Sequence, residues 1–245
     1  MYEKEKISQG DCMAYFVVEG NIGAGKSTFM RVVGSLLNAH IVYEPHQAWQ
    51  NIDGENLLDA FYSDGNRWAY TFQTYAFLTR IFALEEQMKK AEKPYLLSER
   101  SVYADRYCFA KNAYEIGLMN ELEWKLYCDW FSWFVENRTQ RPLGFVYLRT
   151  DPSVCYQRLN KRNRIEEKLV SLDYLKLLHA KHENWLIHRQ DISHRLHDVP
   201  VLVLDCDQDF EASESLQKEH ADRVAEFVVQ QLGIDRSQVF ASKVV

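Results

Sequence analysis

The stretch VVEGNIGAGKSTFM, residues 17–30, decides the fold. Within it, residues 20–27 match the phosphate-loop pattern G-x-x-x-x-G-K-[ST] at every defined position, after an apolar run and before a helical one. Its glycines let the backbone present N–H groups to phosphate oxygens, while Lys26 supplies a positive charge and Ser27 a hydroxyl group for Mg²⁺. The following helix directs the positive end of its dipole at a bound anion. We therefore expect ATP or GTP to bind at Gly20, Asn21, Ile22, Gly23, Ala24, Gly25, Lys26, Ser27 and Thr28.

Short apolar runs alternate with helical patterns on both sides of this loop. The candidate strands are residues 14–19, 40–44, 94–98, 144–149 and 199–205, and long helices are expected over 66–91 and 120–138. Asp151-Pro152 and Ser171 are typical helix starts. Apolar strands separated by helices predict a parallel sheet covered on both faces. Since no repeat or linker divides the sequence, we expect one α/β domain over residues 1–245, with 1–12 as a flexible tail.

Composition narrows the possible partners and location. A formal net charge of −6 argues against a long nucleic-acid footprint, which needs a broad basic surface. No stretch approaches the roughly 18–20 apolar residues of a membrane span. The 5 cysteines are far apart and form no CxxC pair, which favours free thiols in a reducing compartment. We expect a soluble cytoplasmic protein that binds neither nucleic acid nor membranes.

The segment NELEWKLYCDWFSWFVENR, residues 120–138, is aromatic nearly all round. A helix without a polar face is usually buried on both sides. One domain of this size offers limited cover, so we expect the segment to join a helix bundle at a homodimer interface. A core helix buried entirely within its own domain is the alternative.

A bound triphosphate can serve a switch, a motor or a transferase. A GTPase switch should carry a guanine-reading Asn-Lys-x-Asp motif, but the Asn-Lys pair at 160–161 continues with Arg-Asn. A motor would need more chain and a partner surface. Transfer needs a base, an acceptor pocket and positive groups around the phosphoryl group. A P-loop hydrolase without an acceptor and a nucleotide-binding sensor are the alternatives.

Three further stretches offer these groups. Glu44 ends the second strand, where ligands of open α/β sheets gather, and Glu99-Arg100-Ser101 ends the third. Residues 157–167, QRLNKRNRIEE, place four cations within two helical turns and could form a lid over the phosphates. Each stretch also has an alternative without a catalytic role. Glu44 could be an ordinary loop residue, Glu99 and Arg100 could form a local ion pair, and residues 157–167 could form a solvated charged face.

Together these stretches resemble the deoxyribonucleoside kinases, the family of deoxycytidine, deoxyguanosine and deoxyadenosine kinases. The resemblance runs from about residue 14 to about residue 215, and it rests on EGNIGAGKST, on YEP followed by Trp49, on RWAYTFQTYAFLTR, on ERSVYADRY, on the arginine-rich stretch ending in Glu-Glu, and on LHAKHENWL. It implies a P-loop kinase fold with a five-stranded parallel sheet flanked by helices and an arginine-rich lid at 157–167. It also implies Mg-ATP-dependent phosphorylation of a deoxyribonucleoside 5′-hydroxyl in nucleotide salvage.

The resemblance implies individual roles as well. Glu44 would be the general base that deprotonates the 5′-hydroxyl, and Arg100 would hold the 5′-oxygen and the base carboxylate in line. Tyr62 and Glu167 would bind the sugar 3′-hydroxyl. Ser27 and Glu99 would hold Mg²⁺. The expected catalytic residues, including lid arginines that would bind donor phosphates, are Lys26, Glu44, Arg100, Arg158, Arg162 and Arg164.

A second set of residues should surround the acceptor base. Gln73, Ala76 and Arg80 share one helix face at i, i+3 and i+7, and Asp105 and Phe109 can point at the same space. A core with one buried Arg80–Asp105 ion pair is the alternative reading. The expected acceptor-binding residues are Trp49, Tyr62, Phe72, Gln73, Ala76, Arg80, Asp105, Phe109 and Glu167.

The resemblance sharpens the choice of base. Family members with Arg and Asp at positions 80 and 105 phosphorylate deoxycytidine and purine deoxynucleosides, whereas thymidine-accepting members carry smaller or apolar residues there. Ala76 matches the deoxycytidine kinases, but His46 departs from the small apolar residue usual at its position. We expect purine deoxynucleosides as acceptors, deoxycytidine close behind, and thymidine excluded. Asp209 and Phe210 resemble the donor-adenine loop and complete the expected ATP site.

Overall fold

The computed structural model describes residues 13–164 and 166–241, so the expected tail at 1–12 lies outside the described residues. Five parallel strands form one sheet in the order β2-β3-β1-β4-β5, which confirms the predicted fold class. Each strand lies within about two residues of its predicted range. The strands are β1 (Tyr15–Glu19), β2 (Ala39–Val42), β3 (Tyr95–Glu99), β4 (Gly144–Arg149) and β5 (Val201–Asp205).

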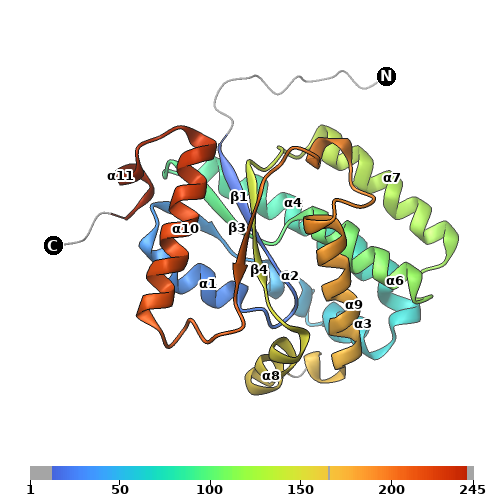
Figure 1. Cartoon of the computed structure of the whole chain (residues 1–245). Helices are drawn as coiled ribbons and strands as arrows, with labels where there is room; N and C mark the ends of the chain where they lie inside the picture. Colours follow the sequence, from blue (N-terminus) through green and yellow to red (C-terminus); the bar gives the residue numbers. More distant parts are fainter. Residues whose placement is uncertain (1–12, 165, 242–245) are drawn as a thin grey trace.

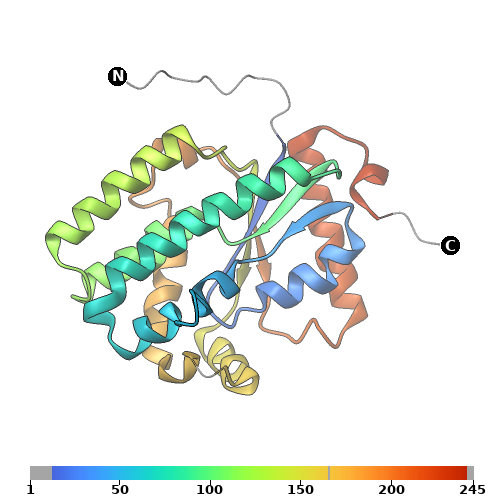
Figure 2. The same ribbon diagram turned by 180° about the vertical axis from the view of Figure 1, so that it is seen from behind.

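Helices cover both faces of the sheet (Figures 1 and 2). Successive residues of a strand point to opposite faces, so β1 sends Phe16 and Val18 into one buried cluster and Val17 into another. Helices α1 (Lys26–Val32) and α10 (Glu214–Leu232) close the first cluster. Helices α4 (Gly65–Lys90) and α7 (Glu121–Asn137) pack in the second. Burial on both faces explains why the strands are apolar throughout.

The other described helices lie in the connections between these elements. Asp151 and Ser171 cap helices by accepting the backbone N–H groups of Ser153 and Tyr174, which confirms both predicted starts. No helix in residues 13–164 and 166–241 combines the length and apolar character that a membrane crossing requires. The remaining segments are α2 (His46–Gln50), α3 (Leu57–Ser63), α5 (Val102–Ala104), α6 (Lys111–Glu115), α8 (Pro152–Arg162), α9 (Leu172–His182), α11 (Arg236–Val239), the 3₁₀ helices η1 (Gly34–Leu36), η3 (Glu166–Leu169) and η5 (His194–Leu196), and the π-helical η2 (Asp105–Ala110) and η4 (Glu183–Ile187).

Helix α7 buries one face and exposes the other. Tyr127, Phe131 and Val135 pack into the core beside α4. The alternative of a helix buried entirely within its own domain is therefore wrong, and the outer face needs another explanation. That face exposes large apolar side chains, namely Leu122 (66%), Leu126 (41%), Trp130 (50%) and Trp133 (51%).

Glu19 ties the end of β1 to the start of α5. The side chain is fully buried, and its Oε1 accepts hydrogen bonds from the backbone N–H (2.9 Å) and the hydroxyl (2.5 Å) of Ser101. This contact follows Arg100, whose φ of +62° lies in the left-handed region that few side chains adopt. Burial raises the pKa of Glu19 to about 7, although Arg100 and Ser101 oppose the shift.

Glu19 should make the stability of the fold depend on pH. Because its pKa rises from 4.5 to about 7 on folding, its stabilising contribution is complete below pH 4.5 and is lost as the pH rises through 7, by about 3 kcal/mol. Glu19→Gln keeps the acceptor for Ser101 without the titration. Denaturant unfolding at about pH 5 and about pH 8 should therefore show the variant gaining stability relative to the wild type at the higher pH. A difference that stays constant between the two would contradict this assignment.

Candidate active site

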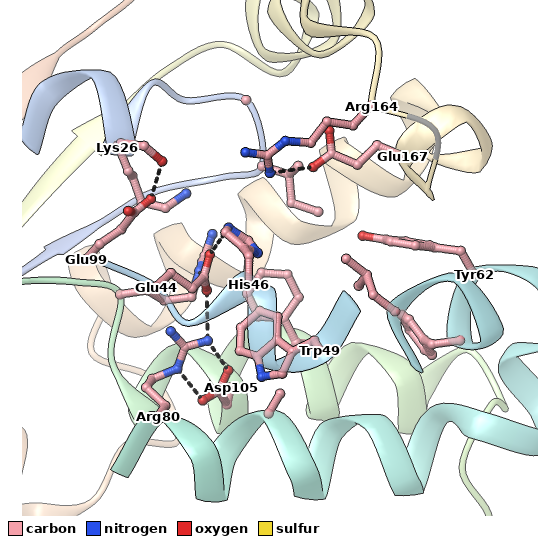
Figure 3. Close-up of a pocket in the computed structure, with 18 of the residues that line it drawn as sticks. Lys26, Glu44, His46, Trp49, Tyr62, Arg80, Glu99, Asp105, Arg164 and Glu167 are labelled. Carbon is pink, nitrogen blue, oxygen red and sulfur yellow. Dashed lines mark hydrogen bonds and ion pairs between the residues drawn. The ribbon is translucent and has the colours of Figure 1, made fainter. Parts of the chain in front are cut away.

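A cavity of about 310 Å³ opens at the carboxyl ends of β1, β2 and β3, the place where ligands bind in open α/β sheets. Its walls come from the phosphate loop, α2, α3, α4, η2 and the segment around η3. In Figure 3, Lys26 and Glu99 lie on one side of Glu44, and Trp49 and Tyr62 lie on the other. One cavity thus joins the predicted phosphate site to the predicted acceptor site.

The phosphate loop connects β1 to α1 in the predicted form. Gly23 and Gly25 have φ angles of +78° and +94°, and a Cβ atom on Gly23 would lie 2.4 Å from the carbonyl oxygen of Cys155. Lys26 Nζ donates to the carbonyl oxygens of Gly20 (3.2 Å) and Asn21 (2.9 Å), and burial lowers its pKa to about 8. The loop residues that line the cavity are Ile22, Gly23, Gly25, Lys26, Ser27 and Thr28, whereas Gly20, Asn21 and Ala24 shape the loop behind it.

Ser27 and Glu99 meet at the foot of the loop. The Ser27 hydroxyl donates to Glu99 Oε1 at 2.7 Å, so the two predicted Mg²⁺ ligands are adjacent. Glu99 is buried at the end of β3. Hard oxygen donors of this kind, completed by phosphate oxygens and water, suit Mg²⁺. The pair therefore fits the ion that the sequence predicts.

Glu44 follows β2 by two residues and is the centre of a buried network of charged and polar groups. Its Oε1 accepts from Arg80 Nη2 at 2.8 Å and from Arg100 Nε at 3.1 Å, and its Oε2 lies 2.9 Å from His46 Nε2. Burial raises the pKa of Glu44, but His46, Arg80 and Arg100 outweigh burial and hold that pKa well below its usual range. The carboxylate is therefore ionised at neutral pH and can accept a proton.

Arg80 extends this network to the far end of the cavity. Its Nε and Nη2 donate to the two carboxylate oxygens of Asp105 at 2.8 and 3.1 Å, while Nη2 also reaches Glu44. The predicted Arg80–Asp105 pair is thus present, and both residues line the cavity instead of the core alone. These hydrogen bonds from one guanidinium group fix the orientation of the Asp105 and Glu44 carboxylates.

Aromatic side chains form the walls around this pair. The rings of Trp49 and Phe72 meet edge to face at 5.8 Å, and the guanidinium group of Arg100 lies 4.6 Å from the Phe109 ring. Gln73 and Ala76 are buried and line the cavity. Flat apolar walls with polar groups at one end suit a nucleobase. All the acceptor-binding residues predicted from sequence line this cavity, namely Trp49, Tyr62, Phe72, Gln73, Ala76, Arg80, Asp105, Phe109 and Glu167.

Sequence reasoning missed several lining residues. Leu58 and Phe61 lie on α3, and the Phe61 ring stacks on Phe72 at 4.8 Å. Their spacing with Tyr62, at i, i+3 and i+4, could have revealed one helix face. Tyr174 on α9 also lines the cavity, and no local pattern marks it. His46 was noticed only as a departure from the family, yet it contacts Glu44.

The predicted lid divides into two parts. Arg162 bonds both oxygens of buried Glu167 at 2.5 Å, and Arg164 lies 3.7 Å from the same carboxylate, all three lining the cavity. Tyr62 lines it too, and burial, reinforced by Glu167, raises the pKa of its phenol. Arg158 lies outside the lining and donates instead to the carbonyl oxygens of residues 206–208.

The predicted adenine loop lies beside the phosphate loop. Phe210 is buried, meets Phe29 edge to face at 6.0 Å, and would be 3.0 Å from a Cβ atom on Gly25. Asp209 accepts the backbone N–H of Glu211. Neither residue lines the cavity, and Phe210 packs against the outer side of the phosphate loop in this structure.

Comparisons with known proteins agree with this geometry. The family model described as deoxynucleoside kinase matches residues 16–229. Deoxycytidine kinase of Homo sapiens is 42% identical over 228 residues, which cover 83% of this chain and 87% of that protein. Deoxycytidine kinase 2 of Gallus gallus is 42% identical (86% and 89% covered), and mitochondrial deoxyguanosine kinase of Xenopus laevis is 38% identical (86% and 88% covered). The chain belongs to the deoxynucleoside kinase family.

Proposed function

We propose that this enzyme transfers the γ-phosphoryl group of ATP to the 5′-hydroxyl of purine deoxynucleosides and deoxycytidine, and that it excludes thymidine. The observation that carries the proposal is that Lys26 and Ser27 line the same cavity as Glu44 and Arg100. A hydrolase or a sensor would have no need of an acceptor pocket with a buried base. Such a reaction serves nucleotide salvage.

The residues divide the chemistry between them. Glu44 takes the proton of the 5′-hydroxyl, because its carboxylate is ionised and faces the cavity. Arg100 orients this carboxylate through Nε. Its buried Nη1 has no hydrogen-bond partner among the described residues, so the N–H groups of Nη1 remain for the acceptor oxygen. Lys26, Arg162 and Arg164 place positive charge around the transferred group. Mg²⁺, when held at Ser27 and Glu99, neutralises phosphate charge.

Three further roles come from the family resemblance. Tyr62 and Glu167 bind the 3′-hydroxyl of the sugar, because both side chains line the cavity and come from the neighbouring segments α3 and η3. The resemblance gives Arg158 a part in binding the donor phosphates, and its bonds to the loop at 206–208 favour an indirect part through that loop. Asp209 and Phe210, which follow this loop, lie beside the adenine in the same proposal.

The base preference follows from Arg80 and Asp105. Their bidentate contact places a guanidinium group and a carboxylate, both buried, where the base edge would lie. Polar groups of this kind pair with the amino and carbonyl groups of a purine or cytosine. The 5-methyl group of thymine would press on these buried charges and offer them no hydrogen bond.

We also propose that the enzyme is a cytoplasmic homodimer. The exposed apolar side chains of α7 follow one another at i, i+4, i+8 and i+11, so they form one stripe. Exposed apolar patches of this kind mark interaction surfaces, and a twofold dimer covers the patch with its own copy. A cytoplasmic location is supported by the four described cysteines, Cys108, Cys128, Cys155 and Cys206, which are free thiols.

Replacement of Glu44 tests the reaction. Glu44→Gln keeps the size and hydrogen-bonding shape of the side chain but removes the base, so kcat should fall about 100-fold or more while acceptor binding persists. The kcat is measured as the rate of transfer of labelled γ-phosphate to a deoxynucleoside. The same change at an exposed position, Glu92→Gln, is the control and should leave kcat unchanged. Unchanged turnover in Glu44→Gln would remove Glu44 from its role, and label released only as inorganic phosphate by the wild type would favour a hydrolase.

Replacement of the ion pair tests the base preference. Arg80→Met with Asp105→Ala should raise the kcat/KM for thymidine relative to deoxycytidine by about 10-fold, because room replaces buried charge. The ratio is the useful measure, since Arg80 also holds Glu44 and all rates should fall. The exposed pair Arg138–Glu85, changed in the same way, is the matched control. If the ratio does not move, the pair has only a structural role.

Charge on the α7 stripe tests the dimer. Trp130→Glu with Trp133→Glu should convert a species of twice the chain mass into a monomer in light scattering at micromolar concentration, because two buried carboxylates oppose association. Leu177→Glu, an exposed apolar residue of α9, is the control and should leave the mass unchanged. A wild-type protein that is already monomeric would refute the dimer.

A further inference from the structure

The two oxygens of Glu44 are not equivalent. Oε1 already accepts two hydrogen bonds, from Arg80 Nη2 at 2.8 Å and Arg100 Nε at 3.1 Å. Oε2 has one partner, His46 Nε2 at 2.9 Å. A carboxylate oxygen offers two lone pairs, so the unused one belongs to Oε2. A proton that leaves the acceptor hydroxyl therefore arrives at the oxygen that His46 contacts.

The surroundings of His46 fix its role in this contact. The residue opens α2, and its ring meets the Trp49 ring edge to face at 5.2 Å. Its Nδ1 atom is buried and has no hydrogen-bond partner among the described residues. A hydrogen on Nδ1 would be left without an acceptor, whereas a bare lone pair there costs less. The hydrogen-bond geometry thus assigns the ring hydrogen to Nε2, which donates to Glu44.

We propose that His46 is a positioning residue for the general base, which holds the Glu44 carboxylate so that the free lone pair of Oε2 faces the 5′-hydroxyl. The inference rests on the proposed kinase reaction. The 5′-hydroxyl proton passes to Oε2, and the electron pair left on the 5′-oxygen forms the new bond to phosphorus. The bond from phosphorus to the bridging oxygen of ADP breaks. His46 keeps its Nε2 hydrogen bond to Glu44 throughout this step.

Three charged groups from other elements line the cavity with Glu44, and none of them contacts Oε2. Arg80 comes from α4 and Arg100 follows β3, and both act on Oε1. Arg164 lies across the cavity and is paired with Glu167. Without His46, Oε2 keeps no partner of its own among the described residues. The two contacts to Oε1 then hold the carboxylate from one side only, so it can swing about Oε1 and turn the free lone pair away from the acceptor. Small misalignments of a base are costly for the chemical step.

Replacement of His46 separates positioning from binding. His46→Val removes the donor and should lower kcat by about 10-fold while the KM for the deoxynucleoside changes by less than about twofold. His46→Gln, whose amide can donate at a similar reach, should recover most of the lost turnover. Gln47→Val, the same change at the exposed neighbour on α2, is the matched control. Thermal unfolding of each variant establishes that the fold is kept.

A double-mutant cycle tests whether His46 acts through Glu44. In the Glu44→Gln enzyme, His46→Val should cause no further loss of kcat, whereas independent effects would multiply. Multiplying effects, an unchanged kcat in His46→Val, or a change confined to KM would overturn the inference. If Glu44→Gln is slow but His46→Val is not, only the inference fails. If Glu44→Gln itself retains full turnover, the general-base role fails and the inference falls with it.

Discussion

The buried carboxylate of Glu44 is the constraint around which the site is organised. An ionised carboxylate out of water is costly unless it is paired and hydrogen-bonded. Here the partners come from three separate parts of the chain: His46 from α2, Arg80 from α4 and Arg100 from the turn after β3. Each of these elements must therefore lie so that its side chain reaches the same point. The parallel sheet makes this possible, because the carboxyl ends of β2 and β3 lie side by side.

Arg80 couples the two ends of the acceptor site. A single guanidinium group bonds Asp105, where the base would lie, and Glu44, where the hydroxyl would lie. Removing it would disturb both recognition and proton transfer. Arg100 also depends on a residue outside the cavity, because the contact between Glu19 and Ser101 supports its left-handed backbone. Arg100, the arginine proposed for catalysis, is thus supported from behind by Glu19, a residue that does not line the cavity.

Sequence reasoning succeeded where local pattern determines position. The phosphate loop, the parallel sheet covered on both faces and the caps at Asp151 and Ser171 follow from short motifs, strand composition and helix chemistry. Glu44 and Arg100 could be placed together because both end strands of one parallel sheet. The acceptor wall at Gln73, Ala76 and Arg80 followed from helix periodicity.

Other features depend on the path of loops, which no local pattern records. Arg158 was expected beside the phosphates, but it bonds carbonyl groups of the loop at 206–208. Phe210 packs behind Gly25 because that loop folds back on the phosphate loop. His46 reaches Glu44 because the chain turns at Pro45, so that two residues of one short segment meet. The sequence of α7 is apolar on both faces, so it reads as a buried helix. Only the fold shows that neighbouring elements cover one of these faces and leave the other exposed.

We expect one cavity to hold both a phosphate donor and a deoxynucleoside acceptor. The most direct measurement of this is the initial rate of label transfer from γ-labelled ATP to deoxyadenosine, deoxyguanosine, deoxycytidine and thymidine in parallel. The structure predicts labelled 5′-monophosphates from the purine deoxynucleosides and deoxycytidine, and little or none from thymidine. Release of inorganic phosphate alone, or thymidine phosphorylated as fast as the others, would contradict it.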